Sequence, residues 1–499
     1  MVTTDLQKQL ANLTPEQRDL ALQKLRERKS GAAVVGDKNS VIVAAQRNGV
    51  APLSFAQQRL WFLEQMEGAS SYYNEFGVQR IIGRFDLSAL QSSLNELVRR
   101  HEILRTTFPE KNGAPIQSIA DAGAVQINTV DLTHLPERQV EREAMLLAEQ
   151  ESKRPFDLAI GPLLRVTVVK CRPERHWLMT NMHHIICDNW SSSVFNREIA
   201  ELYSAYTQGR SSSLPPLPIQ YADFAVWQRD ALSESKREEL LSYWKKQLEP
   251  LPAPLELPTD FGRPAKQTYD GENHPVTWER DLASAVADAG RRYGATPFMV
   301  YLAAYAVLLA RYSCQEEIVI AAPIANRNRK ELEPLIGFFV NTLLLKLDLR
   351  GNPTFEALIQ RAQSVSSDAY AHQDMPLDQL IESLNLSRNT PLFRAMFIFQ
   401  NSPQVKLQSP EIQIEPVEMS SDAVRSDLDF YLMEADGAMQ GSLRYNRDLF
   451  TTATMATMAN RLRLVLERYV LNPTTPLDDL QFESACMLPP IRKPAASIA

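Results

Sequence analysis

Two adjacent histidines and an aspartate lie within one short segment of the sequence, at His183, His184 and Asp188. An imidazole exchanges a proton near neutral pH, and a carboxylate four residues later can orient the ring or hold the surrounding loop. The segment follows an apolar run that predicts a strand and precedes a predicted helix. Catalytic side chains often lie on such loops, held by a rigid scaffold. This segment is therefore the main candidate for a catalytic site.

Other chemistries for this segment are weaker. Successive side chains of a strand point to opposite faces, so His183 and His184 would not share one metal ion, and no HExxH motif or zinc-like spacing is present. A purely structural role, with both histidines buried, stays open. The absence of GxSxG, GxxxxGK[ST] and GxGxxG argues against a serine-elbow hydrolase, a P-loop ATPase and a dinucleotide-dependent dehydrogenase. Histidine-assisted acyl transfer between two bound substrates remains.

The composition is that of a folded, mildly acidic protein. The 499 residues include 53 Lys and Arg and 60 Asp and Glu, a formal charge of -7, which argues against a dedicated nucleic-acid binder. The four cysteines are far apart and form no CxxC pair, which suits a reducing compartment. Residues 1–29 lack a signal-peptide core, and the most apolar stretch, 298–310, is too short to span a bilayer. We therefore expect a cytoplasmic protein without a membrane partner.

The elements that must position the candidate segment alternate between strands and helices. Apolar runs at 163–171 and 177–182 predict two antiparallel strands, and 191–207 has helical periodicity. Helices are also predicted at 58–66, 87–100, 298–312, 355–371 and 450–469, and strands at 317–322, 393–399, 429–432 and 441–445. The sequence thus predicts an α/β protein built from two similar halves.

Breaks in this pattern divide the chain. Residues 1–50 are predicted as an N-terminal helix, at 13–29, and an inter-domain linker, with linker character from 30 to 52. A stretch rich in proline and serine, 211–218, separates the halves. The predicted units are therefore an N-terminal subdomain at 51–218, a C-terminal subdomain at 219–482 and a C-terminal linker at 483–499.

Seven segments, in order, resemble the signature motifs of the condensation domains of nonribosomal peptide synthetases, which are related to chloramphenicol acetyltransferase. They are SFAQQRLWFL (54–63), RHEILRTTF (100–108), HHIICDNWS (183–191), YADFAVW (221–227), IGFFVNT (336–342), HQDMPLD (372–378) and SRNTPL (387–392). The resemblance covers residues 53 to about 480. It implies two chloramphenicol-acetyltransferase-like subdomains in a V-shaped pseudo-dimer, with a central tunnel that passes His184.

The resemblance also implies an activity and its partners. A donor and an acceptor peptidyl carrier domain would each bring a phosphopantetheine arm, the donor arm carrying an acyl or peptidyl thioester and the acceptor arm an aminoacyl thioester whose amine attacks. No cofactor would be bound by this chain itself, which lacks a carrier-type GGxS site. The product would be a peptide bond in secondary-metabolite biosynthesis, with an adenylation domain adjacent in the full synthetase. The chain is expected to be a monomer, and the opening and fourth motifs suggest an L-configured donor.

By the same resemblance, His184 is catalytic, whereas His183 and Asp188 support the motif. Asp188 is expected to pair with Arg327 of the second half. The segment 327–342 should bridge the halves, and a strand-like excursion at about 400–430 should return to the first half. Four more motif residues are assigned to the scaffold: Arg59, Arg105, Trp227 and Asn341.

Asn189 stands where the family usually has glycine. Asparagine tolerates a positive φ, so the loop shape can be kept, but its side chain is an addition near His184. Some relatives are associated with modified residues, so a condensation domain that also dehydrates a seryl unit is one alternative. An epimerisation domain, which shares the fold and HHxxxD, and a non-catalytic platform that docks carriers are others. Heterocyclisation is disfavoured, because aspartate would usually replace the first histidine.

Overall fold

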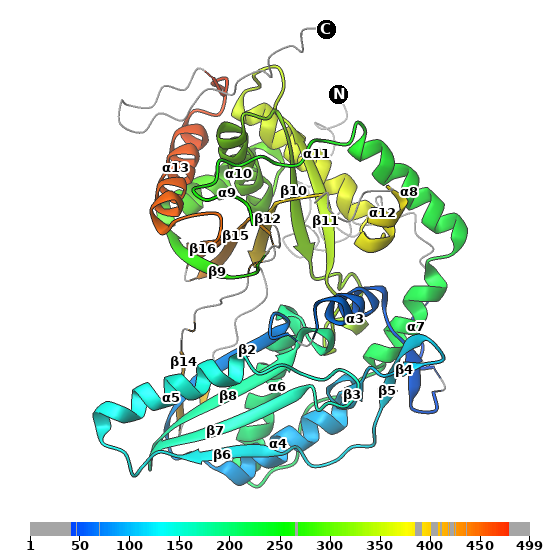
Figure 1. Ribbon diagram of the computed structural model, residues 1–499, viewed down its shortest axis with the longest axis vertical. Helices are drawn as coiled ribbons and strands as arrows, with labels where there is room; N and C mark the ends of the chain where they lie inside the picture. Colours follow the sequence, from blue (N-terminus) through cyan, green and yellow to red (C-terminus); the bar gives the residue numbers. More distant parts are fainter. Residues whose placement is uncertain are drawn as a thin grey trace, which may run out of the picture. The chain divides into compact units, whose positions relative to one another are not determined.

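The computed structural model describes residues 41–478, with these positions left out: 46, 69, 265–267, 385–391, 401–407, 410–411, 418, 420–423, 425 and 436. The helix predicted at 13–29, the C-terminal linker at 483–499 and most of the last motif lie outside the described residues. The described strands form two six-stranded sheets and one smaller sheet, with helices packed against them (Figure 1). The predicted α/β class is confirmed.

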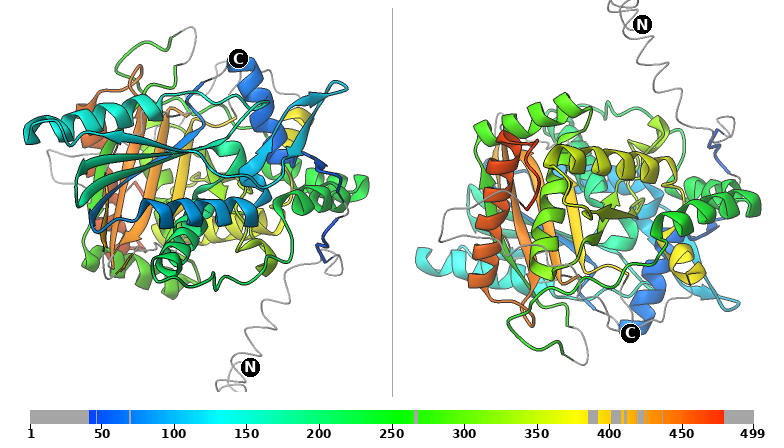
Figure 2. Two further views of the ribbon diagram at one scale, coloured as in Figure 1. Left: turned by 90° about the horizontal axis from the view of Figure 1, so that it is seen from below. Right: turned by 90° about the horizontal axis from the view of Figure 1, so that it is seen from above.

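The first six-stranded sheet has the strand order β13-β14-β2-β8-β7-β6. Its strands are β2 (Asn74–Gly83), β6 (Ile127–Asp131), β7 (Leu164–Arg172), β8 (Arg175–His183), β13 (Gln408–Ser409) and β14 (Ile412–Pro416). Helix α5 covers one face, whereas α4 and α6 cover the other (Figures 1 and 2); their bounds are α4 (Leu87–Arg100), α5 (Glu137–Ser152) and α6 (Asn189–Thr207). Strand β7 is apolar throughout because both faces are buried: Val169 packs towards α5, and its neighbour Val168 packs into the opposite core. The predicted antiparallel pair is β7 and β8.

The second six-stranded sheet has the order β11-β10-β12-β15-β16-β9. Its strands are β9 (Gly271–Trp278), β10 (Glu317–Ile324), β11 (Asn341–Asp348), β12 (Ala395–Gln400), β15 (Leu428–Ala435) and β16 (Ala438–Asn446). The helices packed on it, seen in Figures 1 and 2, are α9 (Arg280–Tyr293), α10 (Pro297–Ser313), α11 (Phe355–Ala371) and α13 (Thr452–Leu471). Helix α10 is apolar on every side because it lies at the centre of this core. No single described helix is long and apolar enough to cross a membrane; α9 and α10 pass that test only as a pair, bent by 103°.

A smaller sheet and several short helices complete the described structure. The sheet contains β1 (Val50–Pro52), β3 (Thr106–Thr107), β4 (Glu110–Lys111) and β5 (Ala114–Ile119). The remaining helices are α3 (Phe55–Glu67), α7 (Tyr221–Ala231), α8 (Glu234–Leu248) and α12 (Leu377–Ser383), and the 3-10 turns are η1 (Glu102–Arg105), η2 (His184–Ile186) and η3 (Lys330–Leu332).

The structure differs from the linker expected over 30–52. Ile42 is buried, and β1 pairs with β5. Arg47 forms ion pairs with Glu102, at 2.6 Å, and with Asp223, at 3.0 Å. These contacts order a segment whose own sequence has little periodicity, because its partners lie far along the chain.

Two segments that follow the 211–218 break pack with the first half. Strand β14 pairs with β2, as expected for the excursion at about 400–430 (Figure 1). The connection between β10 and β11 inserts Leu335, Ile336 and Phe339 into the core that also contains Tyr221. The expected bridging by residues 327–342 is therefore present.

Gly337 lies in this connection against the Tyr221 ring. A Cβ added there would lie 1.9 Å from the nearest ring carbon. We expect Gly337→Ala to lower the free energy of unfolding by about 1–3 kcal/mol, because the ring must shift. Urea denaturation measures the change. Gly123→Ala is the matched control, since no atom lies within 4 Å of its added Cβ; equal midpoints for the two variants would contradict the packing described.

Candidate active site

The HHxxxD segment forms a short turn between a strand and a helix. Strand β8 ends at His183, η2 begins at His184, and α6 begins at Asn189. Asp188 is the N-cap of α6: its Oδ1 accepts hydrogen bonds from the Ser191 amide and the Ser191 hydroxyl, both at 2.7 Å. Aspartate is favoured at this position because it satisfies amides that have no partner inside the helix. The turn is thus fixed at both ends.

The two histidines have different surroundings. His183 is fully buried, and its Nδ1 accepts a hydrogen bond from the Ile185 amide at 3.1 Å. Its Nε2 lies 3.9 Å from the Glu64 carboxylate of α3. Gln57 of α3 also donates to the Ile185 carbonyl, at 3.1 Å. His183 therefore lies beneath the turn, where α3 holds the segment from below.

His184 is partly exposed, with 19% of its side chain accessible. Its Nδ1 lies 2.7 Å from the Cys187 carbonyl oxygen. Because a carbonyl only accepts, we assign the proton to Nδ1, which leaves Nε2 unprotonated. The ring rests against Phe338 with the centroids 4.7 Å apart, and the His184 amide donates to the Tyr73 carbonyl at 2.7 Å. A held imidazole in this tautomer can accept a proton at Nε2.

Asp188 is paired with Arg327, as expected from the sequence. Their side chains are 1% and 2% exposed, and Arg327 Nη2 lies 3.2 Å from Asp188 Oδ1. Arg327 also donates to the carbonyls of Leu332, at 2.5 Å, and Leu335, at 2.8 Å. Asp188 Oδ2 accepts from the Phe339 amide at 3.1 Å. Burial lowers the pKa of Arg327, and the Asp188 carboxylate opposes that shift.

Three residues near His184 were not among the candidates from the sequence. Glu75 of β2 lies 3.4 Å from His184 Nδ1. Tyr431 of β15 forms a side-chain hydrogen bond with Asn189, and the Arg444 guanidinium of β16 lies 4.3 Å from the Tyr431 ring centroid. Burial raises the pKa of Tyr431, so the phenol stays protonated near neutral pH. A polar Tyr431 within an otherwise apolar strand was the available signal.

The remaining motif residues join segments of the scaffold. Arg59 of the first motif lies 3.3 Å from Asp378 of the sixth. Asn341 donates to the carbonyls of Gln373, at 2.8 Å, and Met375, at 2.7 Å. The other two contacts are those of Arg105, which donates to the Ala120 carbonyl at 3.1 Å, and Trp227, whose ring lies 4.7 Å from the Arg329 guanidinium. These contacts hold the motifs together and do not involve His184.

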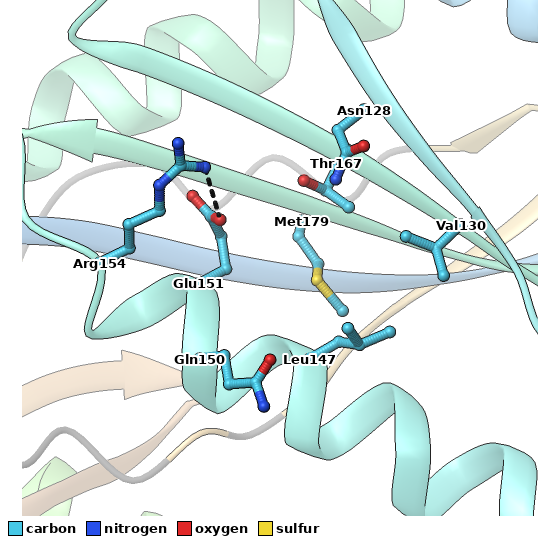
Figure 3. Close-up of a pocket in the computed structure, with 8 residues that line it drawn as sticks. All are labelled: Asn128, Val130, Leu147, Gln150, Glu151, Arg154, Thr167 and Met179. Carbon is cyan, nitrogen blue, oxygen red and sulfur yellow. Dashed lines mark ion pairs between the residues drawn. The ribbon is translucent and has the colours of Figure 1, made fainter.

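A cavity of about 240 Å³ lies apart from this turn, between α5 and strands β6, β7 and β8 (Figure 3). Its lining combines Met179 and Leu147 with the ion-paired Glu151 and Arg154 (Figure 3). It is on the α5 face of the sheet and contains none of the motif residues. Among the residues that the structure describes, no cluster of three His, Cys, Asp or Glu side chains could hold a metal ion.

Comparison with known sequences shows one family across the chain. A family model described as the Condensation domain matches residues 47–485. The chain is 40% identical over 448 residues to a linear gramicidin synthase of Brevibacillus parabrevis, covering 88% of this chain and 6% of that protein. It is 36% identical over 475 residues to phosphinothricin tripeptide synthetase PhsC of Streptomyces viridochromogenes, covering 94% of this chain and 43% of that protein. The chain thus spans less than half the length of these relatives.

Solved structures share the fold. The X-domain from teicoplanin biosynthesis aligns with a TM-score of 0.80 and 28% identity, over 89% of this chain and 100% of that one. The first condensation domain of the CDA synthetase aligns with a TM-score of 0.73 over 87% of this chain and 98% of that one. Identity to the latter is 19%, so that similarity shows the fold alone.

We expect the loss of one charge from the buried pair to destabilise the protein strongly. Asp188→Asn leaves the Arg327 guanidinium buried without its counter-charge, which costs about 3–5 kcal/mol. Urea unfolding measures this loss. The double variant with Arg327→Met should lose less than the sum of the single losses, because the two side chains interact. Glu467→Gln, which breaks an exposed pair with Arg463, is the control and should change stability by under about 0.5 kcal/mol. Additive losses at 188 and 327 would show that the pair is not coupled.

Proposed function

This chain belongs to the condensation domain family, and we propose on that basis that it forms a peptide bond between a donor acyl or peptidyl thioester and an acceptor aminoacyl thioester. Both substrates would be tethered to carrier domains of a nonribosomal peptide synthetase through phosphopantetheine arms. The observation that carries the proposal is the His184 imidazole, which is fixed through Nδ1 by the Cys187 carbonyl with Nε2 able to accept a proton.

The proposed reaction is a direct aminolysis. The acceptor amine attacks the thioester carbonyl carbon, the C–N bond forms, and the C–S bond breaks. The proton that the amine loses passes to Nε2 of His184 and then to the thiolate that leaves on the donor arm. The arms are substrates in this scheme, delivered by the donor and acceptor carriers, and they would meet at His184 in the predicted tunnel.

Magnitudes indicate how much His184 has to do. An α-amine has a pKa of ~8, so part of it is already a competent nucleophile at neutral pH. Holding two reactants together supplies roughly 7–11 kcal/mol, whereas general-base assistance contributes about 10²–10⁴-fold. We therefore assign most of the acceleration to positioning. Asp188 does not compete as the base, because its carboxylate is engaged by Arg327 and by amides of its own turn and the connection.

Asn189 supports a second candidate, in which the domain also removes water from a seryl unit. Its side chain bonds to Tyr431 beside His184, where the family usually has no side chain. Intact-mass analysis of the carrier-bound product separates the candidates: simple condensation keeps the seryl mass, dehydration gives a product lighter by one water, and epimerisation changes neither mass nor connectivity. A binding role is a further alternative, since a complex of the X-domain and OxyB from teicoplanin biosynthesis has been solved.

We expect His184→Ala to slow product formation about 10²–10⁴-fold in a single-turnover assay with loaded donor and acceptor carriers. Carrier binding should be unchanged, because the substitution removes a proton acceptor and leaves the fold in place. His134→Ala, at an exposed loop position, is the matched control and should retain the wild-type rate. A His184→Ala protein that turns over at the wild-type rate would refute the catalytic assignment and favour the binding role.

A further inference from the structure

A carboxylate accompanies the imidazole at the candidate active site. Glu75 Oε1 lies 3.4 Å from His184 Nδ1, and 39% of the Glu75 side chain is exposed. The same nitrogen lies 2.7 Å from the Cys187 carbonyl. The protonated side of the ring therefore faces two oxygens, one neutral and one carrying a negative charge.

The sheet register places Glu75 at this position. In the antiparallel β2–β8 ladder, Asn74 is opposite His183 and Glu75 is opposite Met182. The His184 amide extends this pairing by donating to the Tyr73 carbonyl. Glu75 is thus a diagonal cross-strand neighbour of His184, and such neighbours are within reach of long side chains. The contact is built into the backbone pairing.

The other charged and titratable groups around the ring have partners elsewhere. The Asp188 carboxylate is bound to Arg327. The Tyr431 hydroxyl bonds to Asn189, and Arg444 lies over the Tyr431 ring. In the part of the chain that the structure describes, Glu75 has no ion pair with lysine or arginine, and its one ionic contact is His184.

We propose that Glu75 is a positioning residue for His184, whose carboxylate stabilises the imidazolium formed when Nε2 takes the proton of the acceptor amine. The inference rests on the proposed function. During the step, the amine proton moves to Nε2, the positive charge spreads over both ring nitrogens, and the carboxylate beside Nδ1–H attracts it. The charge is lost again when the departing thiolate takes the proton. Glu75 therefore acts on the charged state of the ring without contacting substrate.

Single-turnover rates of Glu75→Gln across pH test this role. Glutamine keeps the size of the side chain and removes its charge. We expect the maximal rate to fall about tenfold, equivalent to ~1.4 kcal/mol of lost stabilisation, with the KM for the acceptor carrier unchanged. The acidic limb of the pH–rate profile should move to lower pH, because an imidazolium without its counter-charge loses its proton more easily. Glu75→Asp, which retains the charge, should return the limb towards its wild-type position.

Glu415→Gln is the matched control. Glu415 lies in the same sheet, on β14, is 40% exposed, and contacts Arg80 instead of His184. We expect it to leave both the rate and the limb unchanged. A Glu75→Gln protein with the wild-type limb, or with a lowered melting temperature that accounts for its slower rate, overturns the inference.

The two proposals fail in different ways. If His184→Ala slows the reaction and Glu75→Gln does not move the limb, the role of Glu75 is overturned and the proposed function stands. If His184→Ala turns over normally, the proposed function fails and the role of Glu75 fails with it.

Discussion

The buried ion pair between Asp188 and Arg327 joins the turn that carries His184 to the second half of the chain. Two charges removed from water are costly unless their remaining hydrogen-bonding capacity is used. Here amides and a hydroxyl satisfy the carboxylate, while two carbonyls and the same hydroxyl accept from the guanidinium. The pair therefore depends on the whole connection between β10 and β11 being folded in place. The start of α6, and with it the His184 ring, inherits that dependence.

This arrangement divides the ionisable groups by task. Asp188 is buried and fully bonded, so it serves the architecture of the turn. His184 keeps a fifth of its side chain exposed and has one nitrogen occupied by a backbone carbonyl. A backbone acceptor fixes the ring tautomer without adding a charge, and Glu75 adds the charge from a neighbouring strand. Proton transfer and structural support thus fall to different residues within one short segment.

The sequence indicated some elements well because their patterns are local. Helices α4 and α11 were predicted to the residue, and the β7–β8 pair followed from two apolar runs and a turn. Helix α8 was missed, since only Leu240, Trp244 and Leu248 of a charged helix are buried. The ordered segment from Ile42 was interpreted as linker because its partners, such as Asp223, lie far along the chain. Glu75 and Tyr431 were missed for a related reason: strand register and packing between halves bring them to His184. The Asp188–Arg327 pair was expected from family resemblance, which carries long-range information that periodicity lacks.

The pairing of β14 with β2 has a consequence for recombination between synthetases. A crossover placed at the proline-rich stretch 211–218 looks neutral in sequence, yet it would assign β2 and β14 to different parents. It would also separate the turn at Asp188 from the guanidinium that completes it. Chimeras are therefore expected to inherit residues 327–339 and 412–416 from the parent that supplies the first sheet. The heritable unit is thus a discontinuous set of segments, and exchange by simple truncation and ligation would cut through it.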